Sequence, residues 1–303
     1  MSISIRVPAT TANLGPGFDC LGLALDLWNE VEITPEGKQL VIQIEGEGAG
    51  VLPQDETNAI FCAMQFFAKQ HQLTLPVGIH IHCTNRIPLG SGLGSSAAAA
   101  VAGLLAAQSL LNLPSNLDNL VDLATQMEGH PDNAVPCLLG GLGAAIQENG
   151  QIIYRALAIA PLWLAIVTPR FFLPTHQARA ALPEVVAHQD AAFNLGHTVM
   201  VVEALRTGDL DLLKVAMQDR LHQPYRLRLI PGAHQALEAA YAAGAAAVAL
   251  SGAGPSLLAV ARQSQDSQTI ADAMCMAFKN AGLESRIFLP RISILGAFID
   301  KET

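Results

Sequence analysis

The sequence has few charged residues, few aromatic residues and no apolar run long enough for a membrane helix. Of its 303 residues, 14% are charged and 5% aromatic, whereas 51% are hydrophobic. The net charge of −9, without a basic stripe to offset it, argues against a nucleic-acid partner. The most apolar expected helix, 96–111, is too short to span a bilayer comfortably. These features predict a soluble protein with a large core, no nucleic-acid partner and no membrane contact.

Cysteine pairs with metal-ligand or redox spacing are also absent. The chain has five cysteines, an odd number, and no Cys-x-x-Cys pair. Scattered single cysteines are typical of reduced thiols in a cytosolic protein. The first residues read MSISIRVP, which predicts a strand rather than a cleavable signal. We therefore expect a cytoplasmic location.

The most informative segment is a glycine–serine loop, which reads PLGSGLGSSAA at residues 88–98 and leads into an alanine-rich helix. Gly90, Gly92 and Gly94 allow tight turns that bring backbone N–H groups close to a ligand. Ser95 and Ser96 stand where a helix N-cap is expected. The free N–H groups and the dipole of a helix N-terminus favour an anion, most often phosphate. An ordinary capped glycine turn is the simpler alternative.

Two familiar phosphate-binding patterns do not fit this loop. A Walker loop requires a lysine directly after its last glycine, and Gly94 is followed by Ser95. A dinucleotide fingerprint counted from Gly90 also requires glycine at position 95. The phosphate charge must therefore be met by backbone dipoles, a metal ion and side chains from elsewhere.

Strand and helix patterns alternate without a regular βαβ period, which favours an α+β fold with two domains, 1–160 and 161–303. Residues 8–19 are expected to be irregular, and 129–136 to form a tight non-helical segment. The expected helices are 58–70, 95–112, 117–128, 175–188, 190–206, 209–219, 232–243 and 267–281. The expected strands include 3–7, 28–34, 41–44, 77–83, 162–167, 246–250, 257–261 and parts of 285–299.

Two further segments carry a family resemblance. The opening segment reads RVPATTANLGPGFDCLGLAL at residues 6–25, and a second glycine–serine turn reads SGAGPS at 251–256. Together with the loop at 88–98, they resemble the three motifs of the homoserine kinases, a family of the GHMP kinase superfamily. The resemblance covers essentially the whole chain, and the opening motif distinguishes it from mevalonate kinases and galactokinases.

The resemblance implies an enzyme that converts L-homoserine and ATP to O-phospho-L-homoserine and ADP on the route to threonine, with Mg²⁺. It also implies a first domain like the second domain of ribosomal protein S5, a second domain of the ferredoxin type, and a homodimer. Two alternatives remain: a GHMP kinase for another small alcohol, and a non-catalytic sensor of nucleotide and small molecule.

The resemblance also implies a nucleotide site. Asn58 matches a position near adenine, although alone it predicts only the start of a helix. Ser96 and Glu128 match the metal ligands, and their oxygen atoms suit Mg²⁺. The implied ATP-binding residues are Asn58, Pro88, Leu89, Gly90, Ser91, Gly92, Leu93, Gly94, Ser95, Ser96, Ala97 and Ala98.

For the substrate, the resemblance implies that Arg179 and Arg226 bind the carboxylate, which a guanidinium can hold with two hydrogen bonds. Arg228 is a competing candidate. Asp19 would hold the ammonium group, and surface ion pairs are the simpler alternative for the arginines. The remaining implied substrate contacts are Asn13, His130 and Thr175.

The implied catalytic residues are Asn133, Glu128 and Asp132. Asp132 is a candidate general base, but we favour transfer without a base, in which Asn133 orients the hydroxyl and its proton passes to the phosphate. A loose transition state tolerates this, because little deprotonation is needed early. Many family members place the glutamate further from the Asp-Asn pair than Glu128 stands here.

Overall fold

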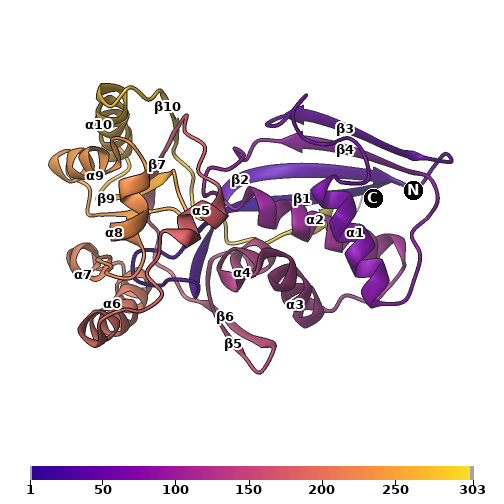
Figure 1. Cartoon of the computed structure of the whole chain (residues 1–303), viewed down its shortest axis with the longest axis horizontal. Helices are drawn as coiled ribbons and strands as arrows, with labels where there is room; N and C mark the ends of the chain where they lie inside the picture. Colours follow the sequence, from indigo (N-terminus) through magenta and orange to yellow (C-terminus); the bar gives the residue numbers. More distant parts are fainter. Residues whose placement is uncertain (1, 301–303) are drawn as a thin grey trace.

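The computed structural model describes residues 2–300, which form two β-sheets with helices packed against them (Figure 1). The strands of the first sheet are β1 (Ile3–Ala12), β2 (Leu21–Thr34), β3 (Leu40–Gly46), β4 (Ile79–Asn85), β5 (Leu142–Glu148), β6 (Gln151–Leu157) and β11 (Phe298–Asp300). Those of the second sheet are β7 (Trp163–Pro169), β8 (Ala247–Leu250), β9 (Leu257–Ala261) and β10 (Ser285–Phe288). The fold is therefore mixed α and β, as expected.

The helices divide between the two sheets. Those of the first part are α1 (Ala59–Gln70), α2 (Ser95–Leu110), α3 (Leu117–Glu128) and α4 (Pro131–Leu139). Those of the second part are α5 (Thr175–Ala180), α6 (His188–Thr207), α7 (Leu210–Ala216), α8 (Gln223–Arg226), α9 (Ala233–Ala242) and α10 (Asp266–Asn280), with a short 3₁₀ helix at Leu227–Leu229. No helix within residues 2–300 is long and apolar enough to cross a membrane.

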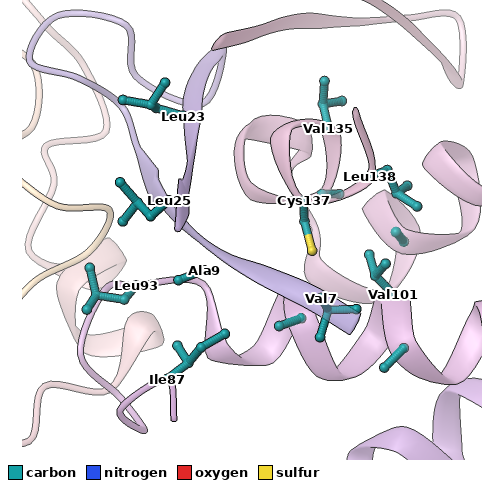
Figure 2. Close-up of a cluster of buried hydrophobic side chains, with 14 of the residues drawn as sticks. Val7, Ala9, Leu23, Leu25, Ile87, Leu93, Val101, Val135, Cys137 and Leu138 are labelled. Atoms are coloured by element: carbon teal, nitrogen blue, oxygen red, sulfur yellow. The ribbon is translucent and has the colours of Figure 1, made fainter. Parts of the chain in front are cut away.

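The first sheet runs in the order β11-β1-β2-β4-β3, and β5 pairs with both β2 and β6. Its pairs are antiparallel except β3 with β4. Helices α2 and α4 pack on β1, and Figure 2 shows part of the apolar core between these elements. Labelled there are Val7, Ala9, Leu23, Leu25, Ile87, Leu93, Val101, Val135, Cys137 and Leu138. This core supports the loops that follow β1 and precede α2.

The second sheet runs in the order β10-β7-β9-β8, and its inner strands β7 and β9 are buried on both faces apart from Trp163. On β7, Leu164 and Ile166 join a cluster with Val201 of α6, whereas Ala165 and Val167 face the cluster built with α9 and α10. This alternation follows from the two-residue period of a strand. The first cluster also contains the core of the first sheet, so the two parts share one continuous core.

The predicted division at residue 160 falls between β6 and β7 and stays a prediction. The end of the described chain does not keep to this division. Strand β11 returns to the first sheet and pairs antiparallel with β1, with Arg6 opposite Phe298. Figure 1 accordingly labels both chain ends on the same side of the molecule.

Three sequence expectations were wrong. Residues 8–12 continue β1, because the register shift between Pro8 and Ala9 accommodates the proline at a bulge. Residues 131–139 form α4, which begins with Pro131 at a first-turn position where a missing N–H costs nothing. Helix α5 ends at Ala180 rather than near residue 188.

The contact between α1 and α2 depends on Gly103, which allows a prediction. Glycine inside a helix normally costs about 0.5–1 kcal/mol relative to alanine. A Cβ at Gly103, however, would collide with the carbonyl oxygen of Ile60, whereas a Cβ at the exposed Gly196 of α6 meets nothing. We expect Gly103→Ala to destabilise the protein by about 1–3 kcal/mol and Gly196→Ala to stabilise it. Urea unfolding measures both changes, and equal signs would contradict the close packing of α1 on α2.

Candidate active site

Three backbone turns meet at the base of the candidate site. They are the β1–β2 connection, the loop before α2 and the turn after β8. The Ser251 hydroxyl donates to the Gly92 carbonyl at 2.7 Å and is hydrogen-bonded to the Thr11 hydroxyl at 2.8 Å, and the Gly252 N–H donates to the Ala12 carbonyl at 3.1 Å. A Cβ at Gly92 would collide with the carbonyl oxygen of Ser251. Glycine therefore permits the close approach that holds the turns together.

The loop before α2 has the geometry expected of a phosphate cradle. Gly90, Gly92 and Gly94 have φ values of 57°, 79° and 70°, in the left-handed region that favours glycine. Gly94, not a serine, occupies the N-cap, so the expectation for Ser95 and Ser96 was wrong: they open the first turn. No side chain caps α2, because glycine carries none. The N–H groups of the first turn are therefore left for a ligand.

A cleft of ≈ 110 Å³ lies over this helix end and gathers most of the expected site residues. Its lining comes from both parts of the chain. It consists of Asn13, Asp19, Gly90, Ser91, Gly92, Gly94, Ser95, Ser96, Glu128, His130, Asp132, Asn133, Leu173, Thr175, Arg179, Arg226, Gly252, Ala253 and Gly254.

Glu128 faces Ser96 across the mouth of the cleft. The Ser96 hydroxyl donates to Glu128 Oε1 at 2.7 Å. Burial raises the pKa of Glu128, and the hydrogen bond from Ser96 offsets part of that shift. Gly129 and His130 are the only residues between α3 and α4, and this short link still brings Glu128 to Ser96. Two oxygen donors beside a helix N-terminus fit a hard divalent cation.

A chain of hydrogen bonds crosses the floor of the cleft. His130 Nδ1 bonds Asp132 Oδ1, Asn133 Nδ2 donates to the same oxygen at 3.3 Å, and the Thr10 hydroxyl donates to Asn133 Oδ1 at 2.7 Å. Burial alone would lower the pKa of His130, but the bond to Asp132 and its charge outweigh burial and raise it. One oxygen of Asp132 thus has two bonding partners.

Asp19 and Arg179 form a bidentate ion pair at the substrate end. Arg179 donates to the two carboxylate oxygens of Asp19 at 3.0 and 2.8 Å. The pair joins residues 160 positions apart and is partly exposed to solvent. Carboxylate oxygens of Asp19 and Asp132 and a ring nitrogen of His130 also lie within 4.8 Å of one another. This acidic corner suits a cation, including an ammonium group.

Arg226 is almost fully buried, with 2% of its surface exposed. Its guanidinium donates to the carbonyl oxygens of Ala178 and Gly252 and lies 3.5 Å from His222 Nδ1, but forms no ion pair with a carboxylate among residues 2–300. Burial, helped by the charge of Arg179, lowers its pKa to about 10. A buried cation without a counterion is a strong site for an anion.

The loop between β1 and β2 is anchored beside this arginine. His222 is fully buried and donates from Nε2 to the carbonyl oxygen of Gly15 at 2.7 Å. Its ring stacks on Phe18 with centroids 5.2 Å apart, and Arg226 lies 5.1 Å from the Phe18 ring. The position of Arg226 therefore depends on the fold of the opening motif.

A second cavity of ≈ 300 Å³ opens from the same helix end, sharing Gly90, Ser95 and Ser96 with the cleft. Apolar side chains from β1 to β4 and α2 form most of its wall, with Asn29, Asn58 and Asn85 as polar members. Its apolar lining is Val7, Val31, Ile44, Leu52, Pro53, Ala59, Ile60, Cys83, Leu89, Ala98, Ala99 and Ala102. This composition suits a planar base.

Some expected residues also have structural duties. Asn13 uses its side chain to donate to Gly252 and to accept from Asp19 N–H. Asn58 caps α1 through its contact with Ile60 N–H and donates to Pro53, as the simpler interpretation predicted. Leu93 and Ala97 point into the core, so only their backbone is available to a ligand.

The structure distinguishes the remaining expected residues by their position relative to the cleft. Arg226 lines the cleft, whereas its competitor Arg228 is exposed and lies outside the cleft lining. Thr175 also lines the cleft, and it does not cap α5, whose N-cap is Pro174. Pro88 accepts a hydrogen bond from the Ser91 hydroxyl and so shapes the loop.

Sequence reasoning missed several residues at this site. Thr10 belongs to the opening motif, but sequence reasoning assigned it no role. The one feature that could have indicated a role is its hydroxyl group in an otherwise apolar strand. Asn29 and Asn85 line the second cavity; Asn29 is a polar residue within β2, and Asn85 is the last residue of β4. His222 stands four residues before Arg226, and sequence reasoning assigned it no role.

Comparisons with known proteins identify the family and the fold. The chain matches the family model of the GHMP kinases N terminal domain at residues 58–141 and that of the GHMP kinases C terminal at residues 201–280. The L. major mevalonate kinase structure shares the fold, with a TM-score of 0.73 at 18% identity, covering 95% of this chain and 94% of that one. The fold and the two family models therefore define a GHMP kinase.

Nearer relatives narrow the family. The homoserine kinase of Moorella thermoacetica is 44% identical over 285 residues, which cover 93% of this chain and 95% of the relative. That of Microchaete diplosiphon is 43% identical over 293 residues, covering 94% and 93%. The crystal structure of the Cytophaga hutchinsonii homoserine kinase has a TM-score of 0.86 and 32% identity, covering 99% and 97%. The chain belongs to the homoserine kinase family.

The buried His222 predicts a pH dependence of stability. Burial, with the charge of Arg226, lowers its pKa below the ordinary value of 6.5, although Asp219 opposes the shift. The unfolded chain therefore binds the proton more readily, and the free energy of unfolding must decrease as the pH falls below about 6.5. We expect His222→Gln, which keeps an N–H donor but does not titrate, to weaken this dependence in urea unfolding between pH 5 and 7.5.

The matched control is His80→Gln on β4, where the histidine side chain is 44% exposed. The change in slope for His222→Gln should exceed the change for this variant, because His80 is not buried. An unchanged slope in the His222→Gln variant would mean that His222 is charged in the folded protein.

Proposed function

We propose that this chain transfers the γ-phosphoryl group of ATP to the side-chain hydroxyl of L-homoserine, forming O-phospho-L-homoserine and ADP on the route to threonine. The observation that carries the proposal is the cleft itself. It joins an uncapped helix N-terminus to a partly exposed Asp19–Arg179 pair and a buried, unpaired Arg226. Membership of the homoserine kinase family supports the same substrates.

The nucleotide would lie across the N-terminus of α2. The triphosphate would accept hydrogen bonds from the N–H groups of Ser95, Ser96 and Ala97, which no side chain caps. The base would enter the apolar cavity of ≈ 300 Å³ on the other side of the helix end. The base of ATP and the acceptor homoserine would thus lie on different sides of the N-terminus of α2.

Mg²⁺ would be held by Ser96 and Glu128, whose oxygen atoms face each other at 2.7 Å. When bound, the ion neutralises phosphate charge that a loop lysine would meet in a Walker site. Burial raises the pKa of Glu128, and a nearby cation would favour the ionised carboxylate.

Homoserine carries a carboxylate and an ammonium group, which match the charges of the cleft. Arg226 would bind the carboxylate together with Arg179, and Asp19 would bind the ammonium group. Asp19 and Arg179 would then give up their mutual ion pair, and each would pair with the oppositely charged end of the substrate. Because charge is replaced by charge, neither residue is left unpaired in a partly buried site.

In the transfer itself, the substrate hydroxyl oxygen would attack the γ-phosphorus while the bond from the γ-phosphorus to the bridging oxygen breaks. That oxygen leaves with its electron pair on ADP, and the hydroxyl proton passes to an oxygen of the transferred group. Asn133 would orient the hydroxyl. The bonds from Asp132 to His130 and Asn133 support a positioning role for Asp132 rather than that of base.

A homodimer and a cytoplasmic location also belong to the proposal. Leu195 and Val199 on α6 are 72% and 65% exposed and offer apolar surface for contact with a second copy. The five cysteines are free thiols in the structure, which suits a reducing compartment.

ADP release with purified protein, Mg-ATP and a substrate panel tests the proposal. Homoserine should be phosphorylated in preference to threonine, mevalonate and galactose. The analogue 3-aminopropan-1-ol, which lacks the carboxylate, should lose at least about 100-fold in kcat/KM, because two charge-assisted hydrogen bonds of about 1.5–3 kcal/mol each are lost. Turnover of mevalonate or galactose alone would indicate another GHMP activity, and nucleotide binding without turnover would indicate a sensor.

Replacement of Glu128 tests the metal site. Glu128→Gln keeps the shape but removes the charge, so we expect kcat to fall by at least about tenfold and the Mg²⁺ concentration for half-maximal rate to rise. The KM for homoserine should change little. Glu148→Gln on the exposed β5–β6 hairpin is the charge-matched control. If Glu128→Gln keeps the wild-type kcat and the wild-type Mg²⁺ dependence, Glu128 is not a ligand of the metal.

A further inference from the structure

Thr10 is buried behind Asn133, which lines the cleft. The side chain of Thr10 is fully buried on β1, and its hydroxyl donates to Asn133 Oδ1 at 2.7 Å. Gly94 covers this contact, because a Cβ at that position would collide with the Thr10 hydroxyl and lie 3.2 Å from Asn133 Oδ1. The loop, the strand and the α4 asparagine therefore meet at one hydroxyl group.

The Asn133 amide is held from both ends. A side-chain amide can turn by 180° and exchange its oxygen with its NH₂ group, and its neighbours decide the outcome. Asn133 Nδ2 donates to Asp132 Oδ1 at 3.3 Å, and an ionised carboxylate offers no hydrogen in return. Thr10 donates at the opposite end. One hydrogen of Nδ2 thus remains for an acceptor in the cleft, while Oδ1 is occupied by Thr10.

We propose that Thr10 is a positioning residue for the phosphoryl transfer, because its hydroxyl keeps the Asn133 N–H, rather than the carbonyl, directed at the substrate hydroxyl. This inference rests on the proposed function. A hydroxyl oxygen that accepts from Asn133 keeps its own hydrogen free to pass to the phosphoryl group. A reversed amide would accept that hydrogen and hold it away from the phosphate.

The substitutions Thr10→Val and Thr10→Ser separate this role from simple packing. Valine replaces the hydroxyl by a methyl group of similar size, and serine restores the donor. We expect Thr10→Val to lower kcat by about 10–100-fold, since small misplacements at a reacting group have effects of this size. The KM for homoserine and the affinity for ADP should stay within about threefold, and Thr10→Ser should recover most of kcat.

A double-mutant cycle with Asn133→Ala tests whether Thr10 acts through Asn133. Thr10→Val should lower kcat in the wild-type background and have no further effect when Asn133 is alanine. Thr168→Val is the matched control, because it removes another buried hydroxyl, which bonds Ser256 at 2.7 Å, and it should leave kcat unchanged. If valine prevents folding, Thr10→Ala takes its place in the cycle.

Wild-type kcat in a folded Thr10→Val variant would overturn the inference, as would equal losses in both backgrounds. Failure of the proposed function would show differently, as a wild-type protein that does not phosphorylate homoserine. If the wild type phosphorylates another alcohol, the cycle is measured on that alcohol with the same expected outcome.

Discussion

The site depends on the close contact of three backbone turns, at Gly92, Ser251 and Ala12. Glycine permits this contact because a Cβ at Gly92 would meet the Ser251 carbonyl, and the Ser251 hydroxyl then ties the turns together. The same contact leaves the start of α2 uncapped and turned to the cleft. Backbone geometry thus creates the anion site first, and charged side chains from both parts of the chain complete it. A few charged residues are enough for this site, because each of them lies on the wall of a cleft whose shape the backbone sets.

Local patterns predicted the helices best. Those expected at 58–70, 95–112 and 117–128 were confirmed within two residues, because apolar spacing and end residues such as Asn58 and Asn116 are local signals. Two of the errors came from proline. Pro8 lies within β1 at a bulge and Pro136 lies inside α4, where neighbouring strands and helices outweigh its local preference. Such tertiary support cannot be predicted from a window of sequence.

The sequence predicted which motifs form the candidate site, but it did not predict which of their side chains bond to one another. The glycine loop indicated a phosphate site from its own residues, and the opening motif indicated the family. The pairing of Asp19 with Arg179 and of Thr10 with Asn133 joins positions 160 and 123 residues apart. No spacing rule predicts such contacts, and they decide which charges are neutralised before a ligand arrives. The burial of Arg226 and the exposure of Arg228 likewise depend on how α8 packs.

The return of β11 to β1 also bears on how the chain is made. During synthesis β1 is produced first, but its outer partner follows every other described element, so this edge of the first sheet stays open until the second sheet has been synthesised. An open strand edge can pair with another chain. A nascent or prematurely ended polypeptide would therefore display a feature that the mature protein hides, which chaperones and proteases can use to tell the two apart.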